Sequence, residues 1–371
     1  MNRLNFLRGL IAGWLWLMAG QSLILVRAEA PHFLVLITLD GVRTEELFGG
    51  LDQETYKAAA KSEAWESQET YKRFWAETPK ERREKLMPFF WREWMVDHGS
   101  VIGNRRQGSQ MNLRNRHRFS YPGYSEILTG TARDKLITSN DKIQNPHPTL
   151  LEFLQSEWKL PKEQTGVFAS WDTMEFIAEH SKGSLFINAG FQPYESIEPR
   201  VQWLSSLQFE TTTPWNSVRH DAYTFAFCMD HIQRNLPRVL YLSLGETDDW
   251  AHDGRYDRVL ENLERSDRYI QNLWEAYQSN PATRDQACFI VTTDHGRGDN
   301  PFNWMHHNDK LEGARHTWMA ICSPNLEHRG EWHHHPEVYS DQIASTAAEI
   351  LGMDFILQHP EAGKPISFLL D

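Results

Sequence analysis

The stretch Val239–Leu244, VLYLSL, is a continuous apolar run that leads directly into Gly245–His252, GETDDWAH. Such a run, apolar on both faces, is typical of a strand buried inside a parallel sheet. Similar runs recur along the chain and alternate with helical stretches, which predicts an α/β fold with a largely parallel sheet. The other expected strands are 32–39, 166–170, 184–188, 288–293 and 317–322, and the expected helices lie near 149–158, 172–180, 216–234, 256–279 and 340–351.

Acids and histidines follow three of these expected strands. Asp40 follows the first, Asp248 and His252 follow VLYLSL, and Asp294-His295 follows the run at 288. Ligands in such sheets bind beyond the carboxyl ends of the strands, so we expect these side chains to gather in one cleft. Crowded carboxylates repel one another unless a cation lies between them. Mixed Asp and neutral His ligands suit Zn²⁺ or a similar divalent ion, and several of them suit two ions.

Composition narrows the protein class. The chain has 371 residues, 40% hydrophobic and 24% charged, which excludes a disordered, fibrous or multi-span membrane protein. Proteins that bind nucleic acid usually carry a basic surface, whereas this chain has a formal net charge of −12. Nucleic acid is therefore not expected as a specific partner. Three cysteines cannot form a disulfide framework.

The N-terminus has the pattern of an export signal. Two arginines, Arg3 and Arg8, precede a mainly apolar run over 9–26, and the residues around Ala28 fit a cleavage site. We therefore predict a secretory signal over 1–28 and a single mature domain over 29–371, periplasmic or secreted, without a membrane span. The alternative is an uncleaved N-terminal anchor, since the apolar run approaches the length of a spanning helix.

Residues 50–110 interrupt the alternation of strands and helices. This segment is rich in Glu, Lys, Arg and Trp and shows no clear strand. We interpret it as a helical insertion after the first strand, which shapes or covers the cleft.

A further block, Phe119–Gly130 (FSYPGYSEILTG), completes a recognisable order of motifs. Together with the acid and histidine blocks, it resembles the alkaline phosphatase superfamily and, within it, the type I phosphodiesterase/nucleotide pyrophosphatase branch. The resemblance implies an alkaline-phosphatase-like core, with a mostly parallel sheet covered by helices on both faces. It also implies a hydrolase of phosphoric esters that uses two divalent ions, Zn²⁺ first and Mn²⁺ as the alternative, on a small phosphorylated substrate.

The resemblance assigns roles to particular residues. Ser120 is the expected nucleophile, forming a covalent phospho-serine intermediate, and Ser125 is the alternative. The resemblance implies one ion held by Asp40, Ser120, Asp294 and His295, and another held by Asp248, His252 and a third histidine, His316, with His307 and His306 as alternatives.

The sequence departs from the family at the phosphoryl-oxygen contact. Phosphodiesterases of this type commonly carry an Asn after the nucleophile, but no Asn occurs between Ser120 and Thr138. The predicted substrate-binding residues are Asn115, Arg118 and Gly123, with Asn104, Arg43 and Arg116 as alternatives. An arginine can make a bidentate contact with a phosphoryl group that has more free oxygens. A phosphoric monoester therefore stays an alternative substrate to a diester.

Other functions within the superfamily also stay open. They are a phosphoryl-type group transferase, a sulfatase-like hydrolase and a non-catalytic metal-binding relative. Sulfatases need an Arg four residues after the nucleophile, where this chain has Tyr124, so ordinary sulfatase activity is not expected.

Overall fold

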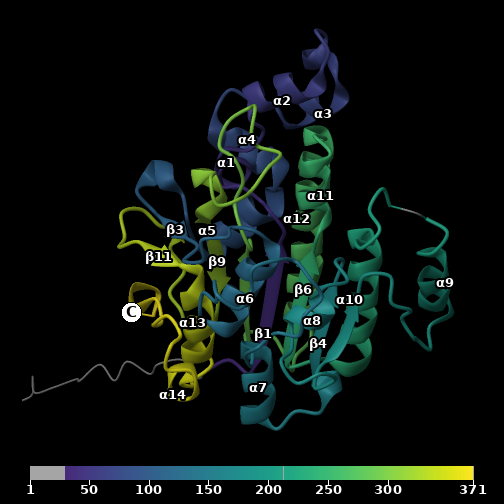
Figure 1. The fold of residues 1–371 in the computed structure, drawn as a ribbon, viewed down its shortest axis with the longest axis vertical. Helices are drawn as coiled ribbons and strands as arrows, with labels where there is room; N and C mark the ends of the chain where they lie inside the picture. The colour runs from purple at the N-terminus through teal and green to yellow at the C-terminus, as the bar shows by residue number, and fades with distance from the viewer. Residues whose placement is uncertain (1–29, 212, 371) are drawn as a thin grey trace, which may run out of the picture.

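A computed structural model describes residues 30–211 and 213–370 (Figure 1). The segment 1–28, for which the sequence predicts a secretory signal, lies outside these residues. None of the helices in the described ranges has the length and apolar character needed to cross a membrane.

The core of the fold is a large sheet. Within the described residues, its eight strands are ordered β10-β2-β9-β7-β1-β6-β4-β5. Neighbouring strands from β7 to β5 run parallel, while β9 pairs antiparallel with β7 and with β2, so the predicted mostly parallel sheet is confirmed. The strands are β1 (Phe33–Leu39), β2 (Ser100–Ile102), β4 (Thr165–Ala169), β5 (Phe186–Ala189), β6 (Val239–Leu244), β7 (Ala287–Thr292), β9 (Met319–Cys322) and β10 (Gly330–Glu331).

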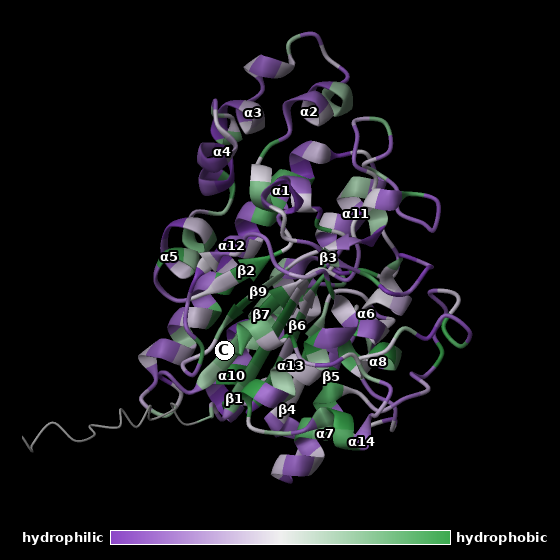
Figure 2. Cartoon of the chain, turned by 90° about the vertical axis from the view of Figure 1, so that its left-hand side faces the viewer, coloured by the Kyte–Doolittle hydropathy of each residue, from purple (hydrophilic) through white to green (hydrophobic). Residues whose placement is uncertain are grey.

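Helices cover both faces of the sheet, and Figure 2 shows its apolar strands enclosed between them. On one face, side chains of β1 such as Val35 and Ile37 pack with α10, α12 and the region after β1. On the other face, Leu34 and Leu36 pack with α6, α7 and α13. The helices are α1 (Thr44–Gly49), α2 (Gln53–Ala60), α3 (Glu69–Phe74), α4 (Pro79–Leu86), α5 (Met95–Asp97), α6 (Ser120–Thr129), α7 (Leu150–Trp158), α8 (Met174–Ile177), α9 (Pro199–Leu207), α10 (Asp221–Asn235), α11 (Glu246–His252), α12 (Tyr256–Ser279), α13 (Ile343–Ile350) and α14 (Phe355–Gln358).

The register of the central strands aligns their carboxyl ends. Thr38 of β1 lies beside Ser243 of β6 on one side and Thr292 of β7 on the other. The residues that follow these three strands therefore meet at one edge of the sheet.

A second, small sheet differs from the expectation for 317–322. This run divides into β8 (His316–Thr317), in a sheet ordered β11-β3-β8, and β9 of the central sheet. The other strands of the small sheet are β3 (Met111–Asn112) and β11 (Val338–Tyr339). The change of sheet occurs at buried Trp318, whose indole N–H donates to the Val42 carbonyl at 2.9 Å.

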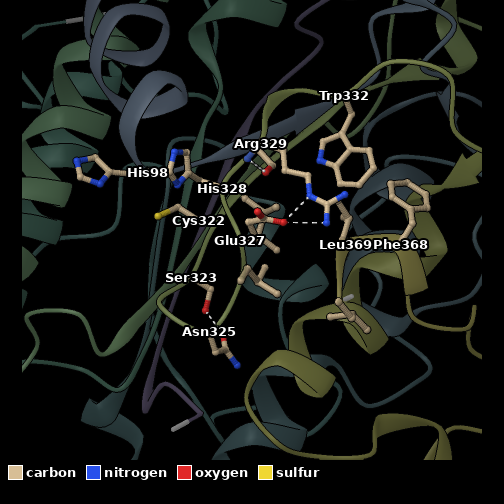
Figure 3. A pocket seen from close by; sticks show the side chains of 14 residues that line it. His98, Cys322, Ser323, Asn325, Glu327, His328, Arg329, Trp332, Phe368 and Leu369 are labelled. Atoms are coloured by element: carbon tan, nitrogen blue, oxygen red, sulfur yellow. Dashed lines mark hydrogen bonds and ion pairs between the residues drawn. The ribbon is translucent and has the colours of Figure 1, made fainter. Parts of the chain in front are cut away.

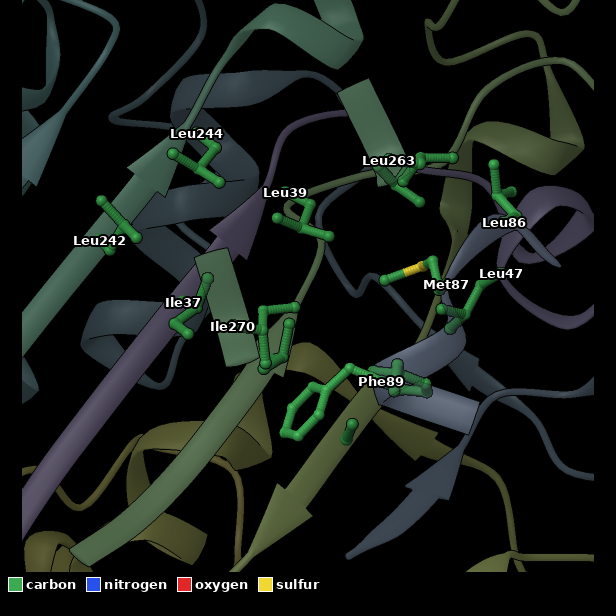
Figure 4. Close-up of a cluster of buried hydrophobic side chains, with 14 of the residues drawn as sticks. Ile37, Leu39, Leu47, Leu86, Met87, Phe89, Leu242, Leu244, Leu263 and Ile270 are labelled. Carbon is green, nitrogen blue, oxygen red and sulfur yellow. The ribbon is translucent and has the colours of Figure 1, made fainter. Parts of the chain in front are cut away.

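The segment 50–110 contains α2 to α5, a π-helical turn over Phe90–Trp94, and one strand that the sequence prediction missed. This strand, β2, is only three residues long, too short to show a periodic pattern. Apolar side chains of the segment, including Leu86, Met87 and Phe89, join the core beside Leu263 and Ile270 of α12 (Figure 4).

Asp267 of α12 anchors this segment through two backbone N–H groups. Its carboxylate accepts from Phe89 N at 2.9 Å and from Phe90 N at 2.8 Å. Burial raises the pKa of Asp267 to about 7, although both N–H donors favour the ionised form. The carboxylate thus joins the segment to the sheet-covering helix.

We predict that Asp267→Ala lowers the free energy of unfolding by about 2–4 kcal/mol, because two buried N–H groups lose their acceptor. Asp257→Ala, on the same helix with a partly exposed side chain, is the matched control and stays within about 0.5 kcal/mol. Urea denaturation followed by circular dichroism measures both. Equal stability of the two variants would show that the Asp267 contacts do not anchor the segment.

Candidate active site

Three carboxylates from separate strand ends surround one histidine nitrogen. His295 Nε2 lies 3.4 Å from Asp40 Oδ1, 3.4 Å from Asp294 Oδ2 and 3.8 Å from Asp248 Oδ1. Asp40 follows β1, Asp294 lies two residues after β7, and Asp248 lies in α11, which follows β6. The aligned strand ends thus bring together acids that are far apart in the sequence.

His295 is oriented to offer a lone pair to this group. Its ring is fully buried, and Nδ1 lies 2.9 Å from the Gly296 carbonyl. A carbonyl only accepts, so Nδ1 carries the proton and Nε2 of the neutral ring is free to bind a cation.

Ser120 reaches the same point from α6, of which it is the first residue. Its Oγ lies 3.3 Å from His295 Nε2. The approach depends on Gly123, where an added Cβ would lie 2.2 Å from the Asp294 carbonyl oxygen. Gly123, which the sequence predicts to bind substrate, lets α6 pack directly against the backbone that carries Asp294. The alternative nucleophile, Ser125, is buried, and its Oγ accepts from Asn145 Nδ2 at 3.4 Å.

A second group consists of Asp248, His252 and His307. Asp248 and His252 are four residues apart in α11 and share one face, with 3.2 Å between Asp248 Oδ2 and His252 Nε2. His307 Nε2 lies 2.9 Å from His252 Nε2 and 3.8 Å from Asp248 Oδ1. His307 Nδ1 lies 3.3 Å from the Arg118 carbonyl, which turns Nε2 toward the group.

The structure does not bring His316 to this group. His316 lies in β8, paired with Asn112 of β3, and its buried Nε2 has no hydrogen-bond partner among the described residues. Burial, followed by the charge of Arg105, lowers its pKa to about 4. The position expected for His316 is taken by His307, the first alternative, while His306 is exposed. The Gly313–Thr317 block leads into a strand of the small sheet, which places His316 away from α11.

Two of the carboxylates each have one buried oxygen without a donor. Among the described residues, no group donates a hydrogen bond to Asp40 Oδ1 or to Asp294 Oδ2. Burial, then the charges of Asp294 and Asp248, raises the pKa of Asp40 well above its usual range, and burial raises that of Asp294 to about 6. Two ligands in a tetrahedral zinc site are about 3.3 Å apart, close to the 3.3–3.4 Å that separate His295 Nε2 from Ser120, Asp40 and Asp294. These residues therefore fit a divalent cation.

Two neighbours hold Asp40 in place. Tyr124 of α6 donates its hydroxyl to Asp40 Oδ2 at 2.8 Å, and Thr247 Oγ1 donates to the Asp40 carbonyl at 2.6 Å. Tyr124 occupies the position where a sulfatase needs Arg, and this hydrogen bond gives it a different role. Asp40 Oδ1 stays directed at His295.

Arg297 is a site residue that the sequence prediction missed. It is buried, and its guanidinium pairs with Asp248 Oδ1. Burial alone would raise the pKa of Asp248, but Arg297, followed by a hydrogen bond from His252, holds it well below its usual range. The available signal was an Arg three residues after Asp294, in Asp294–Gly298 (DHGRG).

The predicted substrate-binding residues before Ser120 shape their own loop. Buried Asn115 donates from its backbone N and from Nδ2 to Glu126, both at 2.8 Å, and its Oδ1 accepts from Arg118 N at 2.9 Å. Arg118 donates from Nη1 to the Leu311 carbonyl at 2.8 Å and pairs with Glu312.

The three alternatives for this contact also have other partners. Arg43 pairs with Glu46, Arg116 pairs with Asp134 at 3.2 Å, and Asn104 donates to Glu331.

Asn140 is a second residue that the sequence prediction missed, since it lies just beyond the segment between Ser120 and Thr138, which contains no Asn. Its Oδ1 accepts from Tyr121 N at 2.9 Å, beside Ser120 at the start of α6. The contact leaves the two hydrogens of Nδ2 without a partner among the described residues. Asn140 is exposed, so its amide is accessible to a bound oxygen.

A separate pocket lies at the other edge of the sheet, near β9 and β10 (Figure 3). Its lining includes His98, Cys322 and Trp332 but none of the predicted site residues. Polar groups there pair with one another, since Arg329 donates to Glu327 at 3.0 Å. The chemistry-bearing residues therefore belong to the edge that carries Ser120.

Comparisons with known proteins identify the family of the chain. Residues 118–353 match the model of the type I phosphodiesterase / nucleotide pyrophosphatase family. No curated protein matches the chain in a sequence search.

Solved structures share the fold at low sequence identity. The alkaline phosphatase PafA is 10% identical, with a TM-score of 0.56 over 93% of this chain and 100% of that chain. A phosphonate monoester hydrolase of Agrobacterium radiobacter is 13% identical, with a TM-score of 0.51 over 91% of this chain and 78% of that chain. A 2-O GAG sulfatase is 11% identical, with a TM-score of 0.52 over 92% and 74%.

These proteins share with this chain the α/β core built on a mainly parallel sheet. Because its family match spans more than half of the sequence, the chain belongs to the type I phosphodiesterase / nucleotide pyrophosphatase family.

Proposed function

We propose that this protein is an exported phosphoric diester hydrolase that uses Ser120 as its nucleophile and depends on two divalent ions. The observation that carries the proposal is the position of Ser120 Oγ, 3.3 Å from a buried histidine nitrogen that three carboxylates surround. Export is supported by the apolar run behind Arg3 and Arg8.

The residues that would hold the ions follow from the two groups. Asp40, Ser120, Asp294 and His295 would hold one, and Asp248, His252 and His307 would hold the other. Mixed oxygen and nitrogen ligands suit Zn²⁺, and such ions would supply positive charge that stabilises the attacking and leaving oxygens.

Ser120 would carry the covalent step. Its Oγ attacks phosphorus in line while the bond from phosphorus to the leaving oxygen breaks, which gives a phospho-serine, and the leaving alcohol takes up the proton that the serine hydroxyl loses. Water then attacks the same phosphorus, the bond from phosphorus to Oγ breaks, and a proton from that water restores the Ser120 hydroxyl. At the start of α6, Asn140 Nδ2 would donate to a non-bridging oxygen and orient the phosphoryl group.

The choice of a diester rests on the arginines. A monoester dianion exposes three terminal oxygens, which a bidentate arginine suits well. Arg43, Arg116 and Arg118 all pair with acids in this structure. The accessible amide of Asn140 is a single neutral donor, which suits the one negative charge of a diester.

We predict that the metal-loaded protein hydrolyses bis-p-nitrophenyl phosphate at least about tenfold faster than p-nitrophenyl phosphate, in kcat/KM. Ser120→Ala should abolish both activities, because the attacking oxygen is lost, while Ser125→Ala retains them. Release of nitrophenolate measures the rates, and circular dichroism checks the fold. Full activity of Ser120→Ala would remove the proposed nucleophile, and a faster monoester would overturn the diester assignment.

We also predict that the two histidines differ in metal binding. His307→Ala should lower the Zn²⁺ content from two ions per chain toward one, because the second group loses a ligand, and His316→Ala should leave two ions bound. Elemental analysis after dialysis against Zn²⁺ and gel filtration measures the content. The reverse result, loss with His316→Ala alone, would restore the third ligand expected from the sequence.

A further inference from the structure

Arg297 connects the two segments that supply the second group. Its Nη2 donates to the Asp248 carbonyl at 2.9 Å and to Asp248 Oδ1, so it makes two hydrogen bonds to α11. Its Nη1 donates to the Met305 carbonyl at 2.5 Å, two residues before His307. Asp248 and His252 lie in α11, whereas His307 lies in the loop that contains Met305. The Arg297 guanidinium therefore contacts both segments that contribute residues to the second group.

The same contact divides the two oxygens of Asp248. The two groups share Asp248, and its Oδ1 lies 3.8 Å from both His295 Nε2 and His307 Nε2. Its Oδ2 faces His252 Nε2 at 3.2 Å. Because Arg297 occupies Oδ1, the oxygen that could join the two groups, Oδ2 is left for the second group.

The backbone leaves room for this ion pair. Gly41, directly after Asp40, has φ +62°, a conformation that favours glycine. A Cβ at this position would lie 2.5 Å from Asp248 Oδ1 and 2.9 Å from Arg297 Nε. A side chain at position 41 would therefore displace Arg297 and Asp248. Gly41, which directly follows Asp40 of the first group, leaves the space that this ion pair needs.

We propose that Arg297 is a positioning residue that assembles the second metal group and assigns Asp248 to it. This inference rests on the proposed two-metal function. Arg297 acts through Asp248 and through the loop that carries His307, so its role is visible in metal binding and does not depend on turnover. We expect a lysine at this position to be a poor substitute. The planar guanidinium donates to Asp248 and to the Met305 carbonyl at the same time, and a lysine ammonium cannot hold both in the same planar arrangement.

The test is a titration of the metal-free protein with Zn²⁺ against a chromophoric chelator, which gives an affinity for each ion. Wild type should bind two ions. Arg297→Met should weaken the second ion by about 10–100-fold and leave the first within about threefold, and Arg297→Lys should fall between them. Arg219→Met is the matched control, because Arg219 is also buried but its guanidinium donates hydrogen bonds to Asn188 and Thr224. This control should bind both ions as wild type does.

Each result decides the proposal. Unchanged affinity for the second ion in Arg297→Met, or equal loss of both ions, would overturn the positioning role. If Arg297→Met does not fold by circular dichroism, Arg297→Lys decides alone, and wild-type affinity for its second ion would overturn the role. Wild type that binds no zinc would instead show that the proposed two-metal function fails, which separates the two claims.

Discussion

The structure depends on a cluster of like charges that its fold forces together. Asp40, Asp248 and Asp294 all approach His295 Nε2 within 3.8 Å, and Asp40 and Asp294 are buried. Three carboxylates in such a place are unfavourable unless positive charge lies between them. Arg297 supplies one such charge at Asp248, while the inward oxygens of Asp40 and Asp294 meet no donor in the part of the chain that the structure describes. The geometry of this cluster therefore fits a cation.

The rest of the fold delivers groups to this point. The register of β1, β6 and β7 places their following residues at one edge, and Gly123 allows α6 to set Ser120 against it. Polar contacts also fix the loop that precedes Ser120. The Glu126 carboxylate accepts hydrogen bonds from the backbone N–H groups of Arg114 and Asn115 and from the Asn115 side-chain amide. Burial raises the pKa of this carboxyl to about 7.

Much of this arrangement could be predicted because strand ends are local signals. An apolar run followed by an acid marks Asp40, Asp248 and Asp294 without knowledge of tertiary contacts, and spacing alone puts His252 beside Asp248. The choice between His307 and His316 depends on where a loop and a two-residue strand run, which no periodicity reveals. Asn140 and Arg297 act through contacts with Tyr121 N and Asp248 that only the folded chain creates. Short strands such as β2 have too few residues to show a periodic pattern.

Anomalous X-ray diffraction at the zinc edge, from crystals grown with Zn²⁺, would locate cations at these residues. We predict two peaks in each molecule, one about 2.0–2.2 Å from ligand atoms of Asp40, Asp294 and His295, and one at similar distances from Asp248, His252 and His307. Zinc bound only elsewhere, or no peak at this edge of the sheet, would show that these residues do not hold two cations.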